Sequence, residues 1–113
     1  MNREDVIAAC RSRPGATEGH PFGEGVLVFK VGGKMFAIVD DSSVSLKCDP
    51  ALAEILRQEH PAVTAGYHLD KRHWNTVDLG GGVPDELLED WIQDSYALVV
   101  AGLSRGQRAS LGQ

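Results

Sequence analysis

Apolar and polar residues alternate along residues 26–48, which is the pattern of β-strands that bury one side against a core. Two such runs flank Gly32-Gly33, and both glycines can adopt the positive φ angles that a two-residue type I′ turn requires. We therefore predict an antiparallel hairpin whose register is fixed by this turn. In that register one face carries the heavier apolar side chains: Leu27, Phe29, Val31, Phe36 and Ile38.

A third strand is predicted over residues 44–48, where Val44, Leu46 and Cys48 form the apolar side. An odd-length loop before it lets this side join the heavier face. An even-length loop would bury Lys47 without a partner, which is costly. Lys30 and Lys47 are therefore expected on the same lighter face, on either side of the middle strand. We expect helices to cover the heavier face and solvent or a ligand to meet the lighter one.

Helical spacing of apolar residues predicts three helices, over residues 2–13, 49–60 and 84–103. Asn2 can cap the first helix, with Asp5 completing the cap three residues later. Asp49 can cap the second, with Pro50 at its first position. The last helix begins at Pro84 and has the longest apolar stripe.

The rest of the chain divides into loops and two further strands. Residues 16–25 contain His20-Pro21 and three glycines and are predicted to be irregular. Residues 62–79 are predicted to hold a strand or strand end at 67–69 and a strand at 74–79, with Trp74, Thr76 and Asp78 on the open face. Residues 104–113 are polar and are predicted to be a disordered tail.

The predicted order is α-β-β-β-α-β-β-α. This order favours an α+β fold in two layers, a mainly antiparallel five-stranded sheet with helices on one face. At 113 residues the chain is long enough for one core, so we expect one domain over residues 1–103.

Composition narrows the functional classes. The net charge is −5, which argues against a strongly basic nucleic-acid-binding protein. Five acids without a base occur in the last predicted helix, however, and outside it 11 acids balance 11 bases. The open face of the sheet can therefore be locally positive, although this acidic run can equally be a solvated helix surface. No apolar run approaches the roughly 20 residues of a membrane span, and two isolated cysteines suit a reducing cytoplasm.

Several strings of the sequence resemble the MmcQ/YjbR family of small bacterial proteins, over nearly the whole chain. They are PFG at 21–23, VFKVGGKMFA at 28–37, LKCDP at 46–50, GYHLDKRHW at 66–74, and Ser95-Tyr96 with Val99. Asp70 departs from the family, which often has Asn there. The resemblance implies a two-layer fold similar to type III secretion chaperones. It also implies a proposed DNA-binding role, based on likeness to a double-wing domain of a phage transcription activator.

The motifs for catalysis and metal binding are weak. His68 and His73 lie close in sequence but lack the short spacing of zinc sites, and neither Cys10 nor Cys48 is near them in sequence. Cys10 lies on the apolar stripe of a helix, which favours an inert buried thiol. We expect no cofactor, no metal site and no enzymatic activity.

Basic side chains and an aromatic residue gather on and beside the open face, where they suit an anionic polymer such as DNA. Alternatively, Trp74 covers the sheet and the lysines are solvated, with their stems on apolar surface. A protein or peptide partner, or a second copy of the chain, could instead meet Val26, Val28, Met35 and Val39. The candidate DNA-binding residues are Lys30, Lys34, Lys47, Lys71, Arg72, His73, Trp74 and Thr76.

Overall fold

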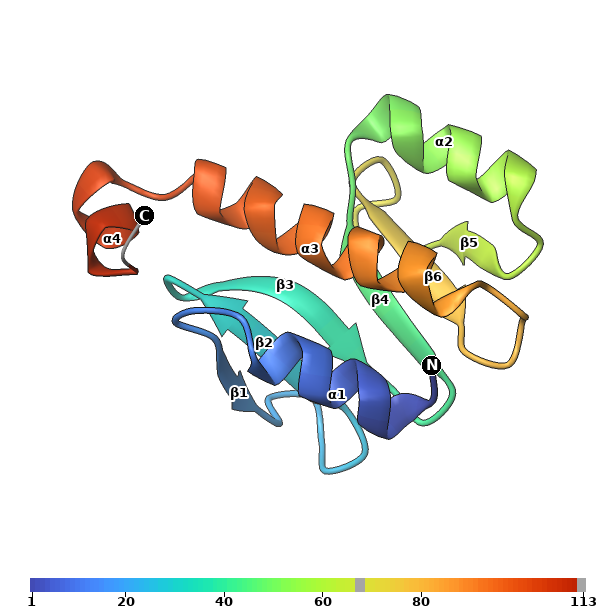
Figure 1. The fold of residues 1–113 in the computed structure, drawn as a ribbon, viewed down its shortest axis with the longest axis horizontal. Helices are drawn as coiled ribbons and strands as arrows, with labels where there is room; N and C mark the ends of the chain where they lie inside the picture. The colour runs from blue at the N-terminus through green and yellow to red at the C-terminus, as the bar shows by residue number, and fades with distance from the viewer. Residues whose placement is uncertain (67–68, 112–113) are drawn as a thin grey trace.

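The computed structural model describes residues 1–66 and 69–111, and in them six strands form one antiparallel sheet (Figure 1). The strand order is β1-β2-β3-β4-β6-β5. The strands are β1 (Thr17–Gly19), β2 (Leu27–Val31), β3 (Lys34–Val39), β4 (Ser43–Lys47), β5 (Val63–Ala65) and β6 (Trp74–Asp78). The helices are α1 (Arg3–Arg11), α2 (Pro50–Glu59), α3 (Asp85–Ala101) and α4 (Arg105–Ser110).

Helices α1, α2 and α3 pack on one face of the sheet and leave the other face open. α3 crosses β2, β3 and β4, α1 lies beside it, and α2 packs on β5 and β6 (Figure 1). Side chains from these helices and from alternate strand positions form one apolar core. The predicted α+β fold is confirmed, with six strands in place of five.

β1 is the strand that the sequence does not predict. It occupies three residues of the segment expected to be irregular and pairs with β2 from Thr17↔Lys30 to Gly19↔Val28. Three residues are too few to show an alternating pattern, and the glycines nearby suggest a loop. β5 also lies earlier than the strand expected at 67–69. Tyr67 and His68 of that expected strand are outside the described residues.

The predicted register of the hairpin is right next to the turn and wrong farther along it. Gly32 and Gly33 have φ angles of 59° and 79°, as a type I′ turn requires, and Lys30 pairs with Met35. A β-bulge at Phe36 then shifts the pairing by one residue, so that Phe29 faces Ala37. The bulge turns Val39 into the core. It also moves Ile38 to the open face, where the side chain is half-buried.

Ser95 of α3 joins the two strands beneath it. The paired residues of β3 and β4 extend to Ala37↔Leu46, next to the bulge. One residue farther on, the Ser95 hydroxyl donates a hydrogen bond to the Phe36 carbonyl (2.6 Å) and accepts one from the Lys47 amide (2.8 Å). The side chain is fully buried. Ser95 therefore satisfies two main-chain groups where the strands begin to separate.

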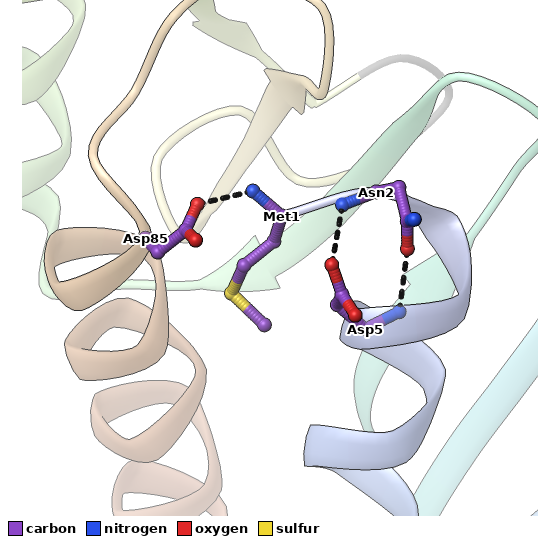
Figure 2. Close-up of polar contacts among 4 residues, drawn as sticks. All are labelled: Met1, Asn2, Asp5 and Asp85. Atoms are coloured by element: carbon purple, nitrogen blue, oxygen red, sulfur yellow. Dashed lines mark hydrogen bonds and ion pairs between the residues drawn. The ribbon is translucent and has the colours of Figure 1, made fainter.

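The chain begins with a cap that also contacts α3. Asn2 and Asp5 form the predicted capping box, in which each side chain accepts a hydrogen bond from the other's backbone amide (Figure 2). The amino group of Met1 forms an ion pair with Asp85 at the start of α3 (Figure 2). These contacts hold the first turns of α1 and α3 together.

The C-terminal segment contains α4, where the sequence predicts a disordered tail. Ser104 caps α4, and its backbone amide donates in return to the side chain of Gln107. Gln107 also donates a hydrogen bond to the carbonyl of Gly32 (3.3 Å). The polar composition of this segment does not predict α4, because Gln107 of the helix bonds to the β2–β3 turn, which is distant in sequence.

We predict that Ser95→Ala lowers the free energy of unfolding by about 2–4 kcal/mol, because two buried main-chain groups lose their partner. Urea denaturation followed by circular dichroism measures this. Ser110→Ala is the control, since its exposed hydroxyl bonds within α4, and it should change stability by less than about 0.5 kcal/mol. A loss below about 1 kcal/mol for Ser95→Ala would contradict the bridging role.

Candidate nucleic-acid interface

The open face of the sheet has a continuous row of small and branched side chains across its middle. Strand pairing fixes this row, and every member points away from the helices. Ser45 and Thr76 occupy its centre, with their hydroxyl oxygens 2.9 Å apart. In strand order the row is Gly19, Val28, Ile38, Ser45, Thr76 and Thr64.

Lys30 and Lys47 lie on the next row of this face, toward the β2–β3 turn. Lys30 pairs with Thr17 and Met35, and Lys47 pairs with Trp74. Both lysines are half-buried. The two lie on either side of β3, so their placement on one face is consistent with the strand pairing. The predicted odd-length loop is wrong, because Val39 pairs with Val44 across a loop of even length, and the bulge at Phe36 compensates for the difference.

Trp74, Lys34 and His73 contribute less to the open face than Lys30 and Lys47 do. Trp74 is 8% exposed, so its ring face is not available for stacking on a base. Lys34 pairs with the core residue Val31, which places it on the helix side beside the turn. The His73 carbonyl accepts a hydrogen bond from the Cys48 amide (2.7 Å), and the His73 imidazole lies 4.0 Å from the Asp70 carboxylate. Trp74 pairs with Lys47 and so lies on the open face as expected, but alternation does not show how deeply a side chain is covered. Lys34 is expected beside the turn and lies there.

Lys71 and Arg72 form an exposed basic turn just before β6. Asp70 holds the turn by accepting a hydrogen bond from the Arg72 amide (3.0 Å). Arg57 of α2 donates to the Lys71 carbonyl (3.1 Å), so a further guanidinium lies beside the turn. Sequence reasoning does not identify Arg57, because 14 residues separate it from its partner and the two elements meet through tertiary packing.

Charges separate along the strand direction. Neighbouring strands alternate in direction, so the end of β2, the start of β3, the end of β4 and the start of β6 meet at one end of the sheet. We call this end, with Lys30, Lys34, Lys47, Lys71 and Arg72, the basic end. Among the described residues, none of these five forms an ion pair with a carboxylate.

The opposite end of the sheet is acidic. Asp40 and Asp41 follow β3, Asp78 ends β6, and Asp85 begins α3 beside Met1. The protein is therefore electrically polarised despite its modest net charge. Carboxylates also lie near the basic end. Asp94 of α3 lines a pocket with Lys47, and Glu54 lines one with Lys71 and Arg72. Asp49 and Asp70 lie there too, and their side chains accept hydrogen bonds from backbone amides. A polyanion would meet its most favourable potential at the basic end.

The thiols are poor nucleophiles. Burial raises the pKa of Cys10 to about 12. Burial also raises the pKa of Cys48, with further contributions from the carboxylates of Asp49 and Asp94. Both cysteines are free thiols and hold their protons at neutral pH, so neither has the thiolate character of a catalytic cysteine.

Among the described residues, no three or more side chains of histidine, cysteine, aspartate or glutamate are grouped so that they could hold a metal ion. His73 lies 4.0 Å from the Asp70 carboxylate, an exposed pair. His68, its expected partner, is outside the described residues.

In the part of the chain that the structure describes, no helix has the length and apolar character needed to cross a bilayer.

Two of the four apolar side chains expected to meet a protein partner are buried. Val39 is fully buried in the helix-side core, and Val28 is 1% exposed. Val26 and Met35 remain half-buried. The open face therefore presents little of the apolar area that a stable homodimer would bury through these four side chains.

Comparison with known proteins finds one family across most of the chain. The model of the YjbR family matches residues 11–98. The uncharacterized protein YjbR of Escherichia coli (strain K12) is 35% identical over 117 residues, covering 100% of this chain and 99% of that protein. The uncharacterized protein YbdF of Escherichia coli O157:H7 is 39% identical over 89 residues, covering 75% of this chain and 73% of that protein.

Solved structures share the fold. The crystal structure of Deinococcus radiodurans protein DR2400, with a DUF419 domain, has a TM-score of 0.90 and 41% identity. The match covers 98% of this chain and 88% of that one. A crystal structure of a Pseudomonas syringae protein has a TM-score of 0.76 and 26% identity, covering 88% of this chain and 99% of that one.

We predict that a disulfide reagent at pH 8 labels Cys48 more slowly than a free thiol and leaves Cys10 unmodified in the native protein. Both should react within minutes in concentrated urea, where burial no longer raises the pKa. Absorbance of the released thiolate measures the rates, and Cys10→Ala and Cys48→Ala assign them. Fast native labelling of Cys10 would show that its environment is not closed.

Proposed function

The chain belongs to the YjbR family, and from this premise and the geometry above we propose that it is a non-enzymatic DNA-binding protein that contacts phosphates with its basic end. The observation that carries the proposal is the gathering of Lys30, Lys34, Lys47, Lys71 and Arg72 at one end of the strands. Asp40, Asp78 and Asp85 lie at the opposite end of the strands, away from the surface that would meet the duplex. The two free cysteines suit a cytoplasmic protein in this role.

The chemistry of this surface supports backbone contacts more than base reading. Lysine ammonium groups and a guanidinium neutralise phosphates, and the release of counterions then drives binding. Helices α1 and α3 pack apolar side chains into the core, and the Trp74 ring, which pairs with Lys47, is buried. Sequence selectivity should therefore be weak.

We predict that the Lys30→Glu/Lys47→Glu variant binds a mixed-sequence duplex at least about tenfold more weakly than wild type at low salt, because two phosphate contacts become repulsions. Fluorescence anisotropy of a labelled duplex at several salt concentrations measures this. The slope of log affinity against log salt should also fall by about two.

Single charge reversals provide the matched control. Lys47→Glu and Arg3→Glu change the net charge equally, but Arg3 lies at the acidic end, where it donates to the carbonyl of Asp40. Lys47→Glu should weaken binding, and Arg3→Glu should change it by less than about twofold. Equal weakening by both variants would show that binding depends on net charge alone and would contradict an interface at the basic end.

A further inference from the structure

A hollow of about 550 Å³ opens on the uncovered face of the sheet, away from the basic end. Its floor is formed by the central row, with Ile38, Ser45 and Thr76. Phe22 and Leu69 belong to its walls and come from two loops far apart in sequence. The volume lies within the range of small-molecule sites, about 300–1,000 Å³. Residues of three strands (β3, β4 and β6) and of three loops thus line one concave site.

The walls of the hollow are mainly apolar. Phe22 is 60% exposed and lines the hollow together with Val26 and Ile38. A flat aromatic or branched ligand would cover this ring and remove apolar surface from water. The exposed ring therefore favours a ligand with an apolar body.

Polar groups occur at two points of the hollow. The Ser45 and Thr76 hydroxyls bond to each other at the floor, so one of their two hydrogens is used in the pair and the other can be donated. Asp40 supplies the one carboxylate among the lining residues, near Ser43. One oxygen of that carboxylate accepts a hydrogen bond from the Asp41 amide (2.8 Å).

The second oxygen of the Asp40 carboxylate has no ion-pair partner among the described residues. Arg3 reaches the Asp40 main-chain carbonyl (3.2 Å) rather than the carboxylate. Asp78 faces the same side, opposite Ser43 on the neighbouring strand. The rim of the hollow is therefore negative, whereas its walls are apolar.

We propose that this hollow binds a small organic cation with an aromatic body, whose ammonium group pairs with Asp40 and whose ring packs between Phe22 and Ile38. The hollow extends from the central row toward Asp40, and none of the five residues of the basic end lines it, so the proposal does not depend on DNA binding. Charge complementarity at the rim selects a cation over an anion of the same shape.

Tryptamine, 3-methylindole and indole-3-propionate test the proposal, because they share a ring and differ in charge. Each is titrated into the ¹⁵N-labelled full chain, and amide shifts give the site and the affinity. We expect saturable shifts at Ile38, Ser45 and Thr76, with tryptamine bound at least about fivefold more tightly than indole-3-propionate. Absence of saturable shifts up to about 10 mM tryptamine would overturn the proposal.

Two neighbouring carboxylates provide a matched pair of variants. Asp40→Asn removes the charge but keeps an oxygen that can accept from the Asp41 amide, whereas Asp41→Asn removes an equal charge outside the hollow. Asp40→Asn should weaken tryptamine binding about three- to tenfold, and Asp41→Asn by less than twofold. Equal weakening by both variants, or amide shifts concentrated on the acidic α3, would show that tryptamine is attracted by the overall negative charge. Either result would overturn the proposed site.

A third variant tests the apolar wall. Phe22→Ala removes an exposed ring that is not part of the core, so the fold should be retained. We expect the affinity for tryptamine and for 3-methylindole to fall together. Unchanged affinity for both would exclude the hollow as the site. Lys47→Glu, which acts at the basic end, should leave tryptamine binding unchanged and so separates this site from the DNA interface.

Discussion

The bridge made by Ser95 is the contact on which the arrangement of the sheet depends. Its hydroxyl replaces a direct bond between β3 and β4 at the point where a bulge displaces Phe36 toward the core. The bridge fixes α3 across the middle strands and holds the end of β4, from which Lys47 extends. One buried hydroxyl thus links the core to the exposed basic end.

The same arrangement separates two surfaces of opposite character. Helices cover one face, so ligands have access to the open face and to the ends of the strands. Because antiparallel strands alternate in direction, residues far apart in sequence meet at one end, and the bases gather there while Asp40 and Asp78 lie at the other. A net charge of −5 is therefore a poor guide to what this protein can bind. The distribution of charge along the strands is more informative than the total.

Features that depend on neighbours in sequence could be predicted, and features that depend on distant contacts could not. The Asn2 cap and the turn at Gly32-Gly33 follow from local chemistry. Lys30 and Lys47 share a face as expected, but through an even-length loop and the bulge rather than through the odd-length loop that the sequence predicts. The bulge at Phe36 does not, because it depends on how β3 meets both β4 and α3. Burial of Trp74, the position of Arg57 beside the basic turn and the hollow at Phe22 likewise arise from packing between loops and strands. Alternation predicts which face a side chain takes but not what covers it.

Mapping a short DNA duplex onto the protein by NMR tests the central claim most directly, because it reports the location of binding as well as its occurrence. The claim predicts that at low salt the amide shifts concentrate at residues 30, 34, 47, 71 and 72 and fade as salt is added. Residues 40, 78 and 85 at the acidic end should remain unshifted. Shifts centred on the acidic end or on the helix face, or no shifts at low salt, would contradict a phosphate-binding role for the basic end.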